Sequence, residues 1–354
     1  MRIVVRGETV LERLALRTRR APRPAFEAAA GMALSGVLVA AARLGLLEQL
    51  ARRPCTAREL ADALELRRET TRLLLDALCA LGYVRVRHGR FVPTRQARRW
   101  LLPESAVSVR HFVAGHRDYW GWWSRLPDVA QGGPSAGHHD APPDDPYWRD
   151  YITGQYELAR LSAPELAAAL HVPRGARRVL DIGGGHGWFA AELCRRHPGM
   201  RATVLDLPGS VAVGRDLLQQ SGYGHLVEHK VADVREADLG RGYDVALCLN
   251  LIHHLRAGEI ADLFRRTHAA LRPDGTLAVL DLFSGAPSPY ARRLHRPGAA
   301  ASCLGLLFHL SSGAEVYSPA QLAGWLEAAG FSRARRTRLR RIPAQTLYQA
   351  RALV

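Results

Sequence analysis

With 354 residues, 47% of them hydrophobic and 23% charged, the chain is long and apolar enough to bury the cores of two globular domains. Its five cysteines include no closely spaced pair, which argues against a zinc site and fits a reduced, cytoplasmic protein. The net charge of +16 comes from three arginine-rich stretches, and only one of the 49 basic residues is a lysine, Lys230. We interpret these stretches, residues 1–25, 85–99 and 331–354, as solvated surfaces, and we expect no nucleic-acid partner.

The first 50 residues suggest an arm followed by a helix. Residues 1–24 are basic and contain two prolines, which predicts an extended arm. Residues 25–50 carry apolar side chains at helical spacing, with many small residues that would let another helix approach closely. The most apolar run, residues 32–47, is interrupted by Arg43 and is shorter than the roughly 20 residues of a bilayer span, so we expect no membrane association.

Residues 54–102 show the pattern of a winged helix. Thr56 and Glu59 have the spacing of a capping box, which predicts a short helix after Thr56. A second helix should follow over residues 68–81 and end at Gly82. Two short strands come next, and the order helix, turn, helix, hairpin is typical of the winged-helix motif.

The pattern changes after a loop rich in glycine, proline and aspartate, residues 132–146. A helix is predicted over residues 146–170, and from residue 177 apolar strands alternate with helices, which indicates a doubly wound α/β fold. The last two predicted strands are joined by a short link, so they should give the parallel sheet an antiparallel edge. We therefore expect a basic arm over 1–24, a winged-helix domain with an aromatic-rich linker over 25–145, and a Rossmann-like domain over 146–354.

A glycine-rich segment, VLDIGGGHG, lies where the first strand of the Rossmann-like domain turns into a helix. Glycines allow a tight turn and the close approach of a ligand. The segment also fits a dinucleotide-binding loop, because Gly185, Gly187 and Ala190 match GxGxxA and Asp206 follows at a suitable distance. Asp181 distinguishes a dinucleotide site from a site for S-adenosylmethionine. A carboxylate beside the loop would repel the pyrophosphate of a dinucleotide, whereas it would attract the ammonium and sulfonium of S-adenosylmethionine.

Acidic residues also end the next two predicted strands. Asp206 could accept hydrogen bonds from both ribose hydroxyls, and Asp233 could accept one from the adenine amino group. In open α/β sheets, ligands bind at the carboxyl ends of the strands. Three acids at three consecutive strand ends therefore predict a binding site for S-adenosylmethionine.

The motifs DIGGGHG, TVLDLP, VADV, NLIHHL and LRPDGTLAVLD resemble those of the plant phenolic and bacterial polyketide-tailoring O-methyltransferases. The winged-helix segment and the ending GAEVYSPAQLAGWLEAAGF fit the same family, so the resemblance covers nearly the whole chain from about residue 30. It implies that the N-terminal domain is a dimerisation module that helps to wall the partner's active site, and we expect a homodimer. It also implies that the cofactor is contacted by Asp181, Gly183, Gly184, Gly185, Asp206, Leu207, Asp233, Val234 and Asn250.

The resemblance places the general base at His254 and its flanking acids at Asp281 and Glu315. A phenol has a pKa of about 10, so a base is needed to ionise it at neutral pH. Imidazole can serve as this base because its pKa is about 6.5. Successive side chains of a strand alternate, so only one of two adjacent histidines can face the methyl group. We expect that histidine to be His254, with Asp281 within its reach, and His253 to contribute mainly to stability.

The chain departs from the plant enzymes directly after His254. The plant enzymes have Asp-Trp at this point, whereas this chain has Leu255 and Arg256. No catalytic metal is expected, although His309 with His254 and an acid is an alternative ligand set. Flat substrates pack on aromatic walls. We expect such walls in two aromatic stretches, at Trp120, Trp123, Phe308 and His309.

These features favour an S-adenosylmethionine-dependent O-methyltransferase that acts on a hydroxyl of a small, aromatic natural product, as in antibiotic biosynthesis and other secondary metabolism. The same fold could serve C- or N-methylation, or a non-methylating tailoring reaction. A protein of another class, a winged-helix DNA-binding regulator, could use Arg67, Arg68 and Arg72 on its second helix. That helix is apolar over residues 73–82, as core helices are, which disfavours the regulator.

Overall fold

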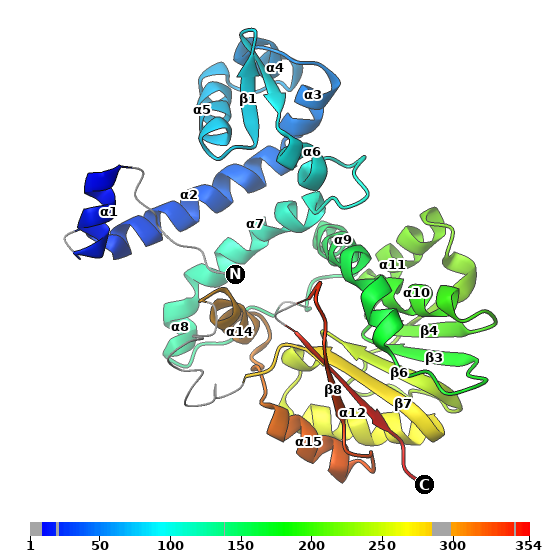
Figure 1. The fold of residues 1–354 in the computed structure, drawn as a ribbon. Helices are drawn as coiled ribbons and strands as arrows, with labels where there is room; N and C mark the ends of the chain where they lie inside the picture. Colours follow the sequence, from blue (N-terminus) through cyan, green and yellow to red (C-terminus); the bar gives the residue numbers. More distant parts are fainter. Residues whose placement is uncertain (1–8, 19–20, 138, 285–298, 343–344) are drawn as a thin grey trace. The chain divides into compact units, whose positions relative to one another are not determined.

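The computed structural model describes residues 9–18, 21–137, 139–284, 299–342 and 345–354. The chain divides into two compact units, Met1–Tyr119 and Trp120–Val354 (Figure 1). The boundary expected from the sequence was at residue 145. The segment 120–145 falls in the second unit, where Ser135 and His139 line a cavity and the indole N–H of Trp148 donates to the carbonyl of Pro142 at 2.9 Å.

The described part of the N-terminal segment contains a helix, α1 (Val10–Arg17). The hydroxyl of Thr9 accepts from the amide of Glu12, and the Glu12 carboxylate accepts from the amide of Thr9. The prediction of an extended arm is therefore wrong for residues 10–17, because this capping box stabilises a helix. Residues 1–8 of the predicted arm lie outside the described part of the chain.

Two helices replace the single helix expected over residues 25–50. The chain turns at Gly45, where φ is +68°, between α2 (Arg23–Arg43) and α3 (Leu46–Arg52). The window Pro24–Arg43 is long and apolar enough to cross a membrane, so the argument from length against a membrane span does not hold. Most of this window is exposed, including Met32 at 78%. Such an apolar surface is typical of a region that another molecule covers.

The winged-helix pattern is confirmed. α4 (Ala57–Ala63) begins with the predicted Thr56–Glu59 capping box, and α5 (Arg68–Ala80) ends shortly before Gly82. β1 (Val84–Arg87) pairs antiparallel with β2 (Arg90–Pro93). α6 (Arg95–Leu101) follows, and α7 (Arg110–Ser124) spans the boundary between the units.

Two arginines of the candidate recognition helix α5 are engaged with neighbouring acids. Arg68 pairs with Asp62 at 2.9 Å, and Arg72 pairs with Asp76 at 2.8 Å. The opposite face of α5 buries Leu75 and other apolar residues in the core of the unit. The helix therefore serves as a core helix.

A seven-stranded sheet with the order β5-β4-β3-β6-β7-β9-β8 forms the centre of the second unit (Figure 1). The first five strands in this order are parallel, and β9 and β8 are antiparallel, as expected for a doubly wound sheet with a terminal hairpin. The strands are β3 (Arg178–Ile182), β4 (Arg201–Asp206), β5 (Val227–Val231), β6 (Tyr243–Leu249), β7 (Leu271–Asp281), β8 (Arg335–Arg338) and β9 (Thr346–Arg351).

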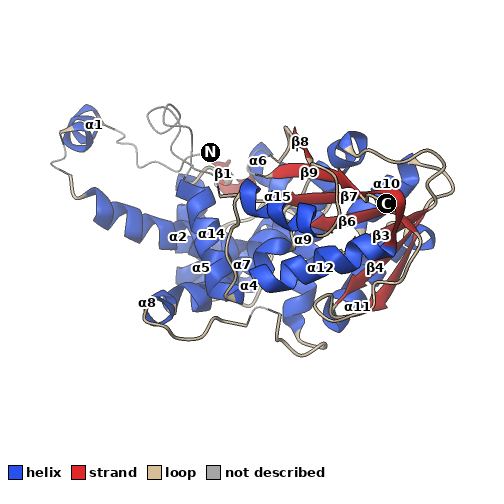
Figure 2. Ribbon diagram, turned by 90° about the horizontal axis from the view of Figure 1, so that it is seen from below, coloured by secondary structure: helices blue, strands red, loops and turns tan. Residues whose placement is uncertain are grey.

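Helices cover both faces of this sheet (Figure 2). Phe264 of α12 and Leu322 of α15 belong to the core on one face, and Leu166 of α9 and Leu193 of α10 to the core on the other. The helical segments are α8 (Leu126–Ala130), α9 (Pro146–Ala169), α10 (Trp188–Arg196), α11 (Pro208–Gln220), η1 (Gly224–Leu226), η2 (Ile252–His254), α12 (Ala257–Ala270), α14 (Ala299–Ser312) and α15 (Pro319–Ala328).

The strand order reverses at β3. The chain runs outward from β3 through β4 to β5, and then returns to the other side of β3 with β6. Ligands of open α/β sheets bind at the carboxyl ends of the strands at such a switch point. The glycine loop that follows β3 lies there.

The outermost strand β5 carries the single lysine of the chain. The side chain of Lys230 is half-exposed and forms an ion pair with Glu228 at 3.4 Å. Charged side chains on an edge strand discourage its pairing with another chain.

Candidate cofactor and active site

A cavity of about 330 Å³ lies at the carboxyl ends of β3, β4 and β6 in the second unit. The sequence predicted nine cofactor contacts on four different loops, and the fold brings all nine to this cavity. That they contact the cofactor stays a prediction. The nine lining residues are Asp181, Gly183, Gly184, Gly185, Asp206, Leu207, Asp233, Val234 and Asn250.

The glycine loop has a backbone that glycine adopts readily and other residues rarely do. Gly183 and Gly185 have φ angles of +63° and +52°. A Cβ added at Gly184 would lie 2.4 Å from Cγ of Asp181, so a side chain there would displace that carboxylate. The glycines thus leave room for Asp181 at the floor of the cavity.

Asp181 is buried at 1% exposure, and neither of its carboxylate oxygens has a hydrogen-bond partner among the described residues. Burial, with the nearby charge of Asp206, raises the pKa of Asp181 to about 8. An uncompensated buried carboxylate is costly unless a cation joins it. The ammonium and sulfonium of S-adenosylmethionine supply such a charge, so the residues fit this cofactor.

Asp206 stands at the end of β4 and fixes the glycine loop. Its carboxylate accepts from the amide of Gly185 at 2.6 Å and from the amide of Leu207 at 2.7 Å. Burial nevertheless raises the pKa of Asp206 to about 6. Its position beside the cavity is consistent with an acceptor for ribose hydroxyls.

We expect Asp206→Ala to weaken the binding of S-adenosylhomocysteine by about 1.5–3 kcal/mol, because hydrogen bonds to a charged acceptor are lost. Isothermal titration calorimetry on the purified protein measures this change. Asp216→Ala, which removes an exposed acid of α11, is the matched control and should leave the affinity unchanged. Unchanged affinity in Asp206→Ala, or tighter binding of NAD by the wild type, would contradict this ribose site.

Two other predicted cofactor residues already have side-chain partners. Arg235 donates to both oxygens of Asp233, with Nη2 at 2.6 Å from Oδ2 and Nε at 3.0 Å from each oxygen. This ion pair lowers the pKa of Asp233. Asn250 has a φ of +55°, and its side-chain oxygen accepts from Nε2 of the Gln345 side chain.

His253 and His254 follow β6 in a 3-10 turn, η2, and not in an extended strand. The strand alternation used to choose between them therefore does not apply. Their rings lie beside each other, with centroids 4.2 Å apart. His253 is buried, whereas His254 lines the cavity.

Asp281 pairs with His253, so the prediction that it lies in reach of His254 is corrected. Nδ1 of His253 is 2.6 Å from Oδ1 of Asp281, which also accepts from the amide of Leu282 at 2.7 Å. Phe308 stacks on the ring of His253 with centroids 3.8 Å apart. When Nδ1–H donates to the carboxylate, Nε2 keeps the lone pair that can accept a proton.

Four other predicted site residues are not among the residues that line the cavity. Glu315 is exposed, and neither it nor Trp123 lines the described cavity. Trp120 is 42% exposed and also does not line it. The Nδ1–H of His309 donates to the carbonyl of Ala314 at 3.0 Å, just after the end of α14.

Sequence reasoning missed several lining residues that precede the glycine loop. His139 stacks on Trp148 with centroids 6.0 Å apart, and it meets the ring of His254 edge-on at 4.7 Å. Burial lowers the pKa of His139 to about 4, so this ring is neutral at pH 7. Trp148 and Tyr151, one helical turn apart at the start of α9, were a signal for an aromatic wall, but no local pattern pointed to His139.

The buried acids of this cavity suit a cationic nucleoside and oppose a pyrophosphate, and on this basis fold and site define the class of S-adenosylmethionine-dependent methyltransferases. The chain belongs to the methyltransferase domain family, whose model matches residues 151–333, more than half of its length. Residues 26–103 match the O-methyltransferase dimerisation domain. The protein is thus a methyltransferase that uses S-adenosylmethionine and carries the dimerisation domain of O-methyltransferases.

Curated relatives support this assignment. A 3-hydroxy-5-methyl-1-naphthoate 3-O-methyltransferase of Streptomyces sahachiroi is 28% identical over 320 residues, covering 88% of this chain and 89% of its own. A mitomycin biosynthesis 6-O-methyltransferase of Streptomyces lavendulae is 27% identical, covering 82% and 83%. Human N-acetylserotonin methyltransferase, solved with S-adenosylmethionine, shares the fold with a TM-score of 0.79 at 20% identity, covering 99% of this chain and 100% of its own.

Proposed function

We propose that this enzyme methylates a hydroxyl group of a small aromatic molecule, with the His253–Asp281 pair as its proton acceptor. The observation that carries the proposal is the 2.6 Å contact between these side chains at the carboxyl ends of β6 and β7. Methyl transfer from a sulfonium is an in-line displacement, so the protein must position the hydroxyl and remove its proton. A positioned base contributes about 10²–10⁴-fold to such a step.

Asp281 makes His253 better suited to this role than His254. A carboxylate on Nδ1 holds the imidazole in one tautomer and stabilises the imidazolium that forms on proton uptake. Asp281 itself is fully buried and is held by the amide of Leu282. His254 stays the alternative base, since it lines the cavity beside His253.

An aromatic acceptor is supported by the rings that surround this centre. Phe308 stacks on His253, and His139, Trp148 and Tyr151 line the cavity. Flat substrates gain affinity from offset or edge-on contacts with such rings. The naphthoate named for the Streptomyces sahachiroi relative is an acceptor of this shape.

Incubation of the enzyme with S-adenosylmethionine and a panel of hydroxylated bicyclic arenes tests the function. Mass spectrometry should show a product that is one methyl group heavier, together with S-adenosylhomocysteine. Matched arenes that carry the hydroxyl as a methyl ether should not react. Turnover of amine acceptors, with inert phenols, would favour N-methylation instead.

We further propose that the enzyme is a soluble, cytoplasmic homodimer, in which a second copy covers the exposed apolar surface of α2. The support is the match of residues 26–103 to a dimerisation domain and the exposure of Phe26, Met32 and Leu34. A self-complementary apolar patch is the usual basis of a twofold dimer.

Met32→Glu should shift the protein from dimer to monomer in light scattering, because an unpaired charge is costly to bury in an apolar contact. Arg85→Glu, on an exposed position of β1, is a control that should stay dimeric. A monomeric wild type would refute the dimer. Binding of the wild type to neutral lipid vesicles would instead assign α2 to a membrane surface.

A further inference from the structure

The loop after β5, residues 233–237, forms one wall of the cofactor cavity. Asp233, Val234 and Arg235 line the cavity, and the loop turns on itself through the amide of Ala237, which donates to the carbonyl of Asp233 at 2.8 Å. By the prediction from the sequence that Asp233 accepts from the adenine amino group, this wall receives the adenine ring. A loop keeps one conformation when its backbone carbonyl groups have hydrogen-bond partners, and here those partners must come from outside the loop.

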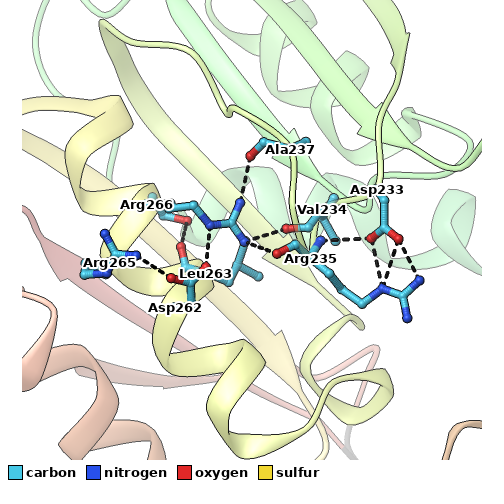
Figure 3. A network of polar contacts seen from close by, with 9 residues as sticks. Asp233, Val234, Arg235, Ala237, Asp262, Leu263, Arg265 and Arg266 are labelled. Atoms are coloured by element: carbon cyan, nitrogen blue, oxygen red, sulfur yellow. Dashed lines mark hydrogen bonds and ion pairs between the residues drawn. The ribbon is translucent and has the colours of Figure 1, made fainter.

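Arg266 of α12 supplies those partners (Figure 3). Its Nη2 donates to the carbonyls of Val234 and Arg235, both at 2.8 Å. Its Nη1 donates to the carbonyl of Ala237, also at 2.8 Å. One guanidinium thus holds three of the carbonyls in a loop of five residues.

The third nitrogen of this guanidinium, Nε, bonds to an acid on the same helix, α12. Nε of Arg266 donates to Oδ2 of Asp262 at 2.6 Å, one helical turn earlier. The side chain of Arg266 is only 18% exposed. Four N–H bonds in a fixed fork are beyond the reach of lysine, whose ammonium offers three donors from one atom.

The neighbouring Arg265 provides a natural comparison. It also pairs with Asp262, but its side chain is 70% exposed and, within the described part of the chain, it bonds to that acid alone. Both arginines lie on α12 and bond to Asp262, but Arg266 also bonds to the carbonyls of loop 233–237.

We propose that Arg266 is a positioning residue for the cofactor: it holds loop 233–237 in the shape that reads the adenine ring. The inference rests on the proposed adenine position and adds a residue that lies outside the cavity lining. It acts through the backbone of Val234 and Arg235 without touching the cofactor. Removing it should leave the chemical step intact and impair recognition of the nucleobase.

The test is the affinity of the full-length protein for S-adenosylhomocysteine and for its inosine analogue, in which a carbonyl replaces the adenine amino group. Arg266→Met should bind S-adenosylhomocysteine about tenfold more weakly or worse, as expected when bonds from a charged donor are lost. Its preference for the adenine form over the inosine form should shrink. The KM for S-adenosylmethionine should rise while kcat at saturating cofactor stays within about twofold of the wild type.

Arg265→Met is the matched control, because it removes the same charge from the same helix and should keep wild-type affinity and preference. Arg266→Lys keeps the charge and serves if Arg266→Met does not fold; it should show the same loss in weaker form. Wild-type affinity and adenine preference in both Arg266 variants would overturn the proposal. A wild type that binds both analogues equally would overturn the adenine position itself, and a wild type that binds neither would overturn the cofactor site.

Discussion

Replacing His253 by alanine should lower turnover by about 10²–10⁴-fold while leaving cofactor affinity nearly intact. The ring that Asp281 orients is lost, and the acceptor hydroxyl then has to ionise without a base. For a phenolic acceptor, the loss should shrink at high pH, because the substrate ionises alone near its pKa of about 10. Rates with S-adenosylmethionine, measured across pH 6 to about 10, give both effects.

His254→Ala is the matched comparison, since it removes an adjacent imidazole that lines the cavity but does not pair with Asp281. We expect a smaller loss, mainly in KM for the acceptor. Asp281→Asn should reproduce much of the His253→Ala loss, because an amide cannot stabilise the imidazolium as a carboxylate does. Near-normal turnover in His253→Ala, with a large loss in His254→Ala, would move the base to His254.

The affinity for S-adenosylhomocysteine should rise with pH between about 6.5 and 8. With a pKa of about 8, Asp181 is mostly protonated at neutral pH in the free protein. The cofactor's ammonium favours the ionised carboxylate, so binding below that pKa releases a proton. The affinity should therefore increase at most about tenfold per pH unit and level off above pH 8.

Calorimetry in buffers with different ionisation enthalpies detects the released proton directly. Asp181→Asn removes the titrating group, so it should bind more weakly and lose both the pH slope and the proton release. Affinity that stays flat across this range in the wild type, without any buffer dependence, would show that Asp181 is already ionised in the free protein or does not meet the ammonium.

Periodic and local signals in the sequence were sufficient for most of the fold. The capping box at Thr56, the alternating strands and helices after residue 177 and the terminal hairpin were all predicted and are present. The same type of signal was overlooked at Thr9 and Glu12, where the basic composition of the segment suggested an arm and the capping box forms a helix. Composition describes solvation, whereas the cap supplies the hydrogen bonds that begin a helix.

The roles proposed for the two adjacent histidines could not be assigned from local pattern. Residues 250–254 were expected to continue the strand, but Asn250 has a positive φ and Ile252–His254 form a tight turn. Which imidazole meets Asp281 depends on this turn and on the end of β7, which is 28 residues from His253. His139 is a similar case, because only the tertiary fold brings its loop to His254.

The composition of the edge strand β5 has a practical use. Because Lys230 is the single lysine among 354 residues, reagents that acylate amines have one side-chain target, apart from the chain's α-amino group. Its side chain is half-exposed, and Lys230 stands three residues before Asp233 on the strand that leads to the cavity. A fluorophore coupled there would label the native sequence at one defined position, near the loop where we propose that the adenine ring binds, and could report on cofactor binding.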